Sequence, residues 1–227
     1  MSAAGGVGFH GKLPVRGDFL TANLPRSFVD PWDAWLQAGI AASQAQLGER
    51  WLSIYLESPI WRFVLSPGAC GPQAWAGVLM PSVDKVGRYF PLTIATELPD
   101  GPSVLETVTT ATTWFERAEA IAMQALDDDG LDLDAFGRDV AALAEIVPSG
   151  PRPSDGDAAP GVWSVPLDAD ASTGVALSTA LDRFVVGSLE AYSVWWSAGG
   201  GSVRGQLWLA GRLPAADRFA RFLITDP

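Results

Sequence analysis

The amino-acid sequence predicts an α/β (α+β) fold, an α/β/α sandwich around a mainly antiparallel sheet. Several segments place apolar residues at three- and four-residue steps, which is the spacing of one helix face. The first half also contains short apolar runs separated by Pro and Gly clusters, a pattern typical of an antiparallel meander. Because helices and strands do not alternate regularly, a parallel doubly wound sheet is not expected.

In the first half, the sequence predicts two helices followed by three strands. The first helix is expected to begin at Asp30, which can cap it, with Pro31 in the first turn, where a missing N–H is tolerated. Its apolar stripe comprises Trp32, Trp35, Leu36, Gly39, Ile40, Ser43 and Leu47. A short second helix should cover 50–56. The three strands, which should form a meander, are expected at 61–65, 74–80 and 89–96.

The second half begins with a predicted long amphipathic helix over 104–126, a segment without Gly or Pro. Asp132 is expected to cap the helix that follows. Beyond it, the predicted elements are a strand at 162–165, a helix at 173–184, a hairpin pairing 193–196 with 206–209, and a helix after Pro214.

Residues 148–161 are rich in Pro, Gly, Ser and Asp and lack large apolar side chains. This composition is typical of an exposed loop or a short linker. The whole chain, 1–227, is long enough to bury a sizeable core and is expected to form a single compact domain. If it divides into two lobes, we expect these to be 1–129 and 130–227.

Composition excludes several classes of partner and site. The net charge of -11 and the pI of about 4.4 disfavour nucleic acid and anionic membrane surfaces as partners. The single cysteine, Cys70, cannot form an internal disulfide or a multi-thiolate metal site. No apolar run approaches the roughly 18 residues of a membrane span, and the first residues lack the pattern of a secretory leader. We therefore expect a cytoplasmic protein without direct membrane insertion.

No motif in the sequence indicates a cofactor, a metal or a catalytic relay. Gly6, Gly8 and Gly11 have dinucleotide-fingerprint spacing, but a preceding strand and a following helix are both missing. His10 is the sole histidine, so a relay or a His-rich metal site cannot be assembled. The sequence thus predicts a protein that is not an enzyme. A hydrolase that uses Asp18 or Asp84 is the alternative within the enzyme class.

Four segments resemble the TagF (ImpM) family of proteins associated with type VI secretion. They are 9–14 (FHGKLP) leading into 16–19, 59–63, 81–92 (PSVDKVGRYFPL), and the predicted strand 193–196 with 211–214 downstream. Lys85 conforms to a family position that carries Lys or Arg, whereas the loop 148–161 has no counterpart in the family pattern.

The resemblance implies a cytosolic accessory protein that restrains type VI secretion after translation, with a forkhead-associated scaffold protein of the same system as its partner. It also implies an N-terminal half similar to a longin or SNARE-like sheet. A structural or assembly subunit of the secretion apparatus remains the alternative to a regulator. The sequence does not determine the oligomeric state.

The matched segments supply candidate partner-binding residues in two loops. Cations and a carboxylate cluster in 12–18, and a second charged set lies in the connection 81–91 between two predicted strands. We expect both loops to lie at one end of the sheet and to form a shared site; alternatively, Asp84 and Arg88 only lock their own turn. Together with the strand residues, the candidates are Lys12, Arg16, Asp18, Ser82, Asp84, Lys85, Arg88, Trp195 and Trp196.

Two further groups of side chains could serve recognition. Arg16, Arg62 and Arg88 are able to donate planar, bidentate hydrogen bonds to a carboxylate or phosphate of a partner. Trp195 and Trp196 must point to opposite faces of their strand. If one face lacks a covering helix, its Trp is an interface anchor; if helices cover both faces, both side chains belong to the core.

Overall fold

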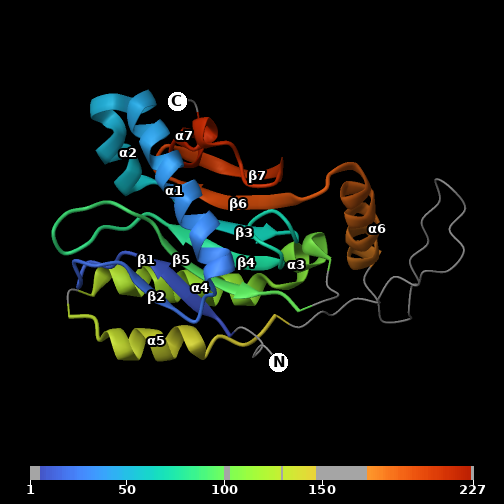
Figure 1. Ribbon diagram of the computed structural model, residues 1–227, viewed down its shortest axis with the longest axis horizontal. Helices are drawn as coiled ribbons and strands as arrows, with labels where there is room; N and C mark the ends of the chain where they lie inside the picture. The colour runs from blue at the N-terminus through green and yellow to red at the C-terminus, as the bar shows by residue number, and fades with distance from the viewer. Residues whose placement is uncertain (1–5, 100–102, 129, 147–172, 226–227) are drawn as a thin grey trace, which may run out of the picture.

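A seven-stranded antiparallel sheet forms the centre of the computed structural model, which describes residues 6–99, 103–128, 130–146 and 173–225 (Figure 1). The spatial order of the strands is β2-β1-β5-β4-β3-β6-β7. Their bounds are β1 Gly8–Gly11, β2 Leu20–Ala22, β3 Trp61–Leu65, β4 Trp75–Met80, β5 Leu92–Glu97, β6 Tyr192–Gly200 and β7 Val203–Gly211. The predicted meander is confirmed as β3, β4 and β5.

Helices cover both faces of the sheet, which confirms the predicted three-layer sandwich (Figure 1). One face carries α1 (Arg26–Leu47), α2 (Trp51–Glu57) and α7 (Ala220–Leu223), and the other carries α3 (Val104–Thr110), α4 (Thr112–Asp127) and α5 (Leu133–Ala141). The remaining helix, α6 (Thr173–Ser188), lies beside α3. Short 3₁₀ turns span Gly48–Arg50 and Ala216–Arg218.

The two cores differ in composition. The core under α1 is aromatic: Trp32, Phe63 and Trp195 pack with ring centroids 4.7 to 5.9 Å apart. Each of these tryptophans finds a polar partner, since Trp32 Nε1 donates to a threonine hydroxyl and Trp195 Nε1 to a serine hydroxyl. On the other face, α4 buries small residues, Ala118 and Ala122, against the sheet.

The first helix begins at Arg26 with Pro25 in the cap position, so Asp30 is not its cap and Pro31 lies inside it. Pro31 has no N–H for the carbonyl of Ser27, one turn before it. That carbonyl instead lies against Gly71, where an added Cβ would come within 2.5 Å of it. A side chain at position 71 would therefore collide with this carbonyl. The predicted apolar stripe is otherwise confirmed, with Trp35 partly buried.

The predicted long helix over 104–126 is wrong in one respect, because the chain forms two helices that meet at Ala111. Threonine hydroxyls before this break donate to carbonyls of the preceding turn: Thr109 and Thr110 both bond the carbonyl of Glu106. Such back-bonding competes with the helix ladder and bends helices. The cap at Asp132 is confirmed, since its side chain accepts from the amide of Asp134.

Within the described residues, the C-terminal half agrees with the prediction. The helix at 173–184 is confirmed as α6, and the hairpin is confirmed as β6 and β7, with Trp196 opposite Leu207. Since β6 pairs with β3, strands from both predicted lobes belong to one sheet. The loop 148–161 and the strand 162–165 lie outside the described residues. Among those that are described, no helix is both long and apolar enough to cross a membrane.

Candidate functional site

The loops 12–19 and 81–91, which we call the paired loops, meet at one end of the sheet. They follow β1 and β4, and both β1 and β4 pair with β5, so the pairing of strands brings the loops together. The amide of Lys85 donates to the carbonyl of Arg16 at 3.0 Å, and Ser82 Oγ donates to the carbonyl of Lys12 at 2.7 Å. The prediction that both loops lie at one end of the sheet is confirmed.

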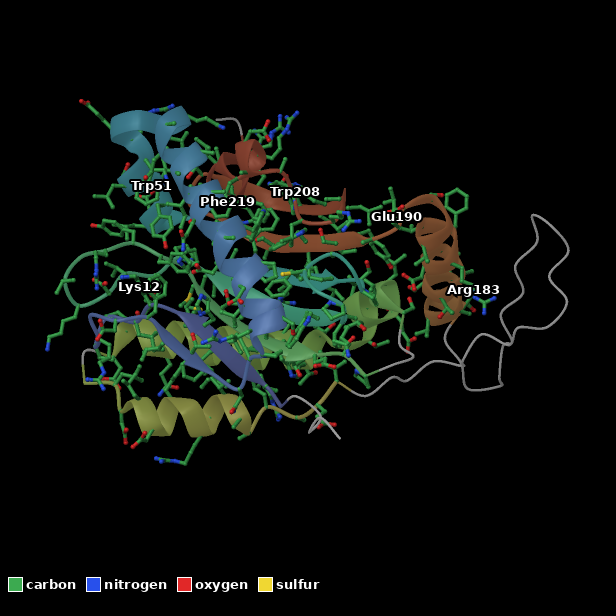
Figure 2. All side chains as sticks on the ribbon, in the orientation of Figure 1. Lys12, Trp51, Arg183, Glu190, Trp208 and Phe219 are labelled. Atoms are coloured by element: carbon green, nitrogen blue, oxygen red, sulfur yellow. The ribbon has the colours of Figure 1, made fainter. Side chains whose placement is uncertain are left out.

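A buried ion pair holds the paired loops together. Lys12 Nζ donates to the Asp84 carboxylate, and both side chains are almost completely shielded from solvent. Arg88 Nε donates to Asp84 Oδ2 at 2.7 Å, and Arg88 also reaches the carbonyl of Gly17 in the other loop. Figure 2 shows Lys12 beside the projecting 81–91 loop. The predicted locking of this turn by Asp84 and Arg88 is therefore confirmed, and Arg88 also joins the turn to the other loop.

Asp84 has its full set of hydrogen-bond donors. Besides the two cations, the backbone amides of Val86 and Arg88 donate to Oδ1 at 3.0 and 2.9 Å. Burial alone would raise the pKa of Asp84, but hydrogen bonds from Lys12, Arg88 and the two amides outweigh it and hold the pKa well below its usual range. A carboxylate stabilised in this way is a weak general base, which argues against catalysis by Asp84.

Tyr55 on α2 binds the backbone of the same turn through its buried side chain. Its hydroxyl donates to the carbonyl of Ser82 at 2.9 Å and accepts from the amide of Ser82 at 3.0 Å. Burial raises the pKa of Tyr55 above its usual value, with only partial compensation from the bond to Ser82. Sequence reasoning missed Tyr55, because its helical position is typical of any core aromatic residue and nothing in the sequence places it beside a loop 27 residues away.

His10 is the second residue that sequence reasoning left without a role. Its Nδ1 lies 2.8 Å from Thr21 Oγ1 and its Nε2 lies 3.3 Å from Asp33 Oδ1. The ring is buried and stacks on Phe19, with centroids 5.9 Å apart. Phe19 also lies 4.8 Å from Phe90, and Lys12 Nζ sits over the Phe19 ring. These contacts fix the first of the paired loops to the sheet.

The paired loops thus divide into a buried floor and an exposed rim. We define the floor as Lys12, Ser82 and Asp84, all of which are buried. We define the rim as Arg16, Asp18, Phe19, Lys85 and Val86, all of which are exposed. Phe19 and Val86 are the apolar members of the rim, with 47% and 68% of their surface accessible. Of the predicted site residues, Arg16, Asp18, Lys85 and Arg88 are exposed, but Arg88 already donates to Asp84 and to the carbonyl of Gly17.

The remaining predicted residues are less available. Arg62 donates to Glu119 of α4 through both Nε and Nη2 at 2.7 Å, so it is not free for a partner, contrary to the expectation. Trp195 is fully buried among the rings under α1. Trp196 packs edge-to-face on Phe115, with centroids 4.8 Å apart, and lines an open groove of about 570 Å³ between α4 and β6. Helices cover both faces at this strand, so both tryptophans contribute to the cores.

Within the described part of the chain, no three His, Cys, Asp or Glu side chains gather as a metal site would require. Cys70 is buried, and burial raises the pKa of its thiol to about 12, which leaves it protonated and unreactive at neutral pH. The arrangement at the paired loops therefore offers what protein recognition needs, namely exposed charges and apolar side chains on a fixed backbone.

Comparison with known proteins agrees with this geometry. The model of the TagF N-terminal domain, described as type VI secretion system-associated, matches residues 8–143, a range that includes both paired loops. No curated protein matches the chain.

Among solved structures, the chain is similar to the crystal structure of PA0076 from Pseudomonas aeruginosa PAO1, with 38% sequence identity and a TM-score of 0.80. That match covers 97% of this chain and 95% of the other, so the likeness extends beyond the N-terminal domain. The chain belongs to the TagF family and is a type VI secretion-associated protein.

Proposed function

We propose that this protein is a cytoplasmic, non-enzymatic negative regulator of type VI secretion that binds a forkhead-associated scaffold protein through the rim. The exposure of Phe19 and Val86 on two hydrogen-bonded loops carries the proposal. Binding would remove the exposed apolar surface of both side chains from contact with water. The flanking Arg16, Asp18 and Lys85 would select a partner with complementary charges.

The floor supports this role because it fixes the rim before binding. An interface loop that is already ordered loses little conformational entropy when its partner docks. Lys12, Ser82 and Asp84 each join the first loop to the second, so the relative position of Arg16 and Lys85 is set within the free protein. This arrangement favours recognition, since the apolar surface that Phe19 and Val86 leave exposed lies on loops that a buried ion pair already holds in place.

The same contacts weigh against the enzyme alternative. Asp84 is enclosed by four donors. Asp18 is exposed, and both ring nitrogens of the sole histidine, His10, are already bonded, to Thr21 and Asp33. We also propose that the whole chain is one folding unit, since β6 pairs with β3 in a common sheet.

Titration calorimetry with the purified chain and the forkhead-associated protein of the same secretion system tests the proposal. We expect saturable binding, together with reduced effector secretion when the chain is overproduced in the native bacterium. Absence of binding with both proteins folded would overturn the partner assignment. Recovery of the chain at fixed stoichiometry from assembled apparatus, with secretion lost on deletion, would instead support a structural subunit.

A further inference from the structure

Strand β7 forms a long edge of the sheet with a strand partner on one side only, within the residues that the structure describes. Figure 1 shows it beyond β6, at the side of the sheet opposite β2. The other edge strand, β2, has three residues, whereas β7 has nine. A long edge strand presents unpaired backbone groups to which another chain can add, and proteins usually shield such an edge.

The register shows which backbone groups of β7 are directed outward. The carbonyl of Ala191 accepts from the amide of Arg212 on the β7 side, whereas the carbonyl of Tyr192 accepts from the amide of Ser66 on the β3 side. Because such pairs alternate along an antiparallel ladder, the backbone groups of Leu207, Leu209 and Gly211 are directed away from β6.

The start of the strand is covered, which limits the free stretch. The amide of Arg204 donates to Thr225 Oγ1 at 2.7 Å, so the C-terminal segment occupies the edge at that point. From Gly205 to the end of the strand at Gly211, the described residues place no second strand alongside. This leaves a length of edge that an extended segment of about six or seven residues could fill.

A groove of about 350 Å³ runs beside this stretch of β7. Trp208, Leu213 and Pro214 form its apolar surface, and Arg218 and Arg221 line it as well. Figure 2 shows Trp208 on this side of the molecule. On the opposite face of the strand, Leu207 and Leu209 are exposed to 59% and 50%. A strand added here would therefore place alternate side chains in the groove and beside the two leucines.

The charge beside this edge differs in sign from that of the whole chain. Arg204, Arg218 and Arg221 are all exposed, and within the described ranges no carboxylate lies within 4 Å of their guanidinium groups. In a protein with a net charge of -11, three unpaired guanidinium groups near one strand create a local site for negative charge.

We propose that β7 and its groove bind an extended, Asp- or Glu-containing segment of another protein, which adds to the sheet as an eighth strand. Main-chain hydrogen bonds to the free edge would provide the pairing, and Arg218 and Arg221 would bind the acidic side chains that enter the groove. A second copy of the chain fits less well, because two β7 strands side by side would bring the arginines of both copies together, and their positive charges would repel. The proposal does not depend on the rim, whose two loops follow β1 and β4 and not the edge strand β7.

The test measures fluorescence anisotropy of a labelled nine-residue peptide in which Glu and Val alternate, with a Lys and Val peptide of equal length for comparison. The full-length protein is used as wild type, as Arg218→Glu with Arg221→Glu, and as Leu209→Pro. Leu209 directs its amide outward, so proline at this position blocks an added strand while leaving the β6 ladder intact. Arg117→Glu with Arg138→Glu, on α4 and α5, is the matched control for charge.

We expect the acidic peptide to bind, and binding to weaken at least about tenfold in the arginine variant and in Leu209→Pro, with the control close to wild type. Circular dichroism spectra and thermal midpoints establish that each variant is folded. The proposal is overturned if the acidic peptide does not bind, if the Lys peptide binds equally well, or if both folded variants retain wild-type affinity. Light scattering that shows a dimer lost in Leu209→Pro would assign the edge to a second copy and also overturn it.

Discussion

The floor and the rim of the paired loops lie within the same two short segments but differ in burial and in hydrogen bonding. The floor is buried, and each of its polar groups is bonded across the two loops. The rim is exposed, and Lys85 and Val86 extend from backbone that the floor holds in place. Neighbouring residues can therefore differ in role: Asp84 holds the loops together, whereas Lys85 is exposed on the surface.

This comparison shows why a charged loop motif cannot be assigned to binding as a whole. A side chain that is already saturated within the protein contributes to the position of its neighbours, and only a side chain with free surface can meet a partner. Variants that change only the floor or only the rim therefore test whether the two regions have separate roles, and floor variants should have the largest effect on stability.

Lys12→Met should be the most destabilising of these variants. The substitution keeps the apolar stem but leaves the buried Asp84 carboxylate without its closest cation. We expect a loss of about 3 kcal/mol in the free energy of unfolding, the lower end of the range for a buried pair that loses one partner. Guanidinium denaturation measures this loss, and a change below about 0.5 kcal/mol would show that Arg88 alone suffices to hold the loop.

The depressed pKa of Asp84 predicts a dependence of stability on acid. A carboxyl group whose pKa is lower in the folded state than its unfolded value of 3.8 stabilises the fold above pH 3.8. That contribution is lost as the pH falls below 3.8 toward the folded pKa. Urea unfolding of wild type and Asp84→Asn at about pH 2 to 6 should give curves that converge at low pH. Parallel curves over this range would contradict the assignment.

Tyr55→Phe should have a smaller effect than Lys12→Met, because it removes one hydroxyl and no charge. The substitution leaves the buried amide of Ser82 without its partner and removes one of the two donors to the Ser82 carbonyl, which still accepts from the amide of Phe90. We expect a loss of about 1 to 3 kcal/mol in the free energy of unfolding by thermal or chemical denaturation. Tyr89→Phe is the matched control, since it makes the same change at a partly buried tyrosine of the 81–91 loop, and its stability should be close to that of the wild type. Equal losses in the two variants would contradict a specific role for the Tyr55 hydroxyl.

Asp182 on α6 provides a carboxyl group whose pKa is shifted in the opposite direction to that of Asp84. Burial raises its pKa to about 6, and hydrogen bonds at the start of α3 offset this only in part; among the described residues, Oδ1 has no hydrogen-bond partner. Its contribution to stability is therefore present below pH 3.8 and is lost as the pH rises through about 6. Asp182→Asn should flatten the stability curve between about pH 4 and 7, and an unchanged slope would show that the carboxyl group is solvated.

The sequence predicted the layers and most elements because these depend on local patterns. The stripe on α1, the meander of three strands and the cap at Asp132 follow from the spacing of apolar and capping residues. The start of α1 was not predictable in this way, since Asp30 and Pro31 have the local pattern of a helix start, yet the structure places both inside the helix.

The site was predictable in location but not in roles. Resemblance and loop composition indicated both paired loops, yet the division into floor and rim depends on contacts between distant parts of the chain, such as that of Lys12 with Asp84, 72 residues apart. Arg62 was expected to be free, and its partner Glu119 on α4 could not be identified from spacing alone. The edge at β7 escaped notice for the same reason, because exposure of a strand depends on the order of the whole sheet.

Rim variants should have the smallest effect on stability, within about 0.5 kcal/mol, because their side chains are exposed. Arg16→Glu with Val86→Glu changes one charge and one apolar contact of the rim. Arg117→Glu with Leu177→Glu is the matched control, since it makes the same two kinds of change at exposed positions of α4 and α6.

The affinity of these two double variants for the forkhead-associated protein, measured by titration calorimetry beside the wild type, tests most directly whether the rim binds this partner. We predict that the rim variant stays folded and binds at least about tenfold more weakly, whereas the control binds as the wild type does. A folded rim variant with wild-type affinity would contradict the account, because the exposed residues of the paired loops would then not be the surface that meets the partner.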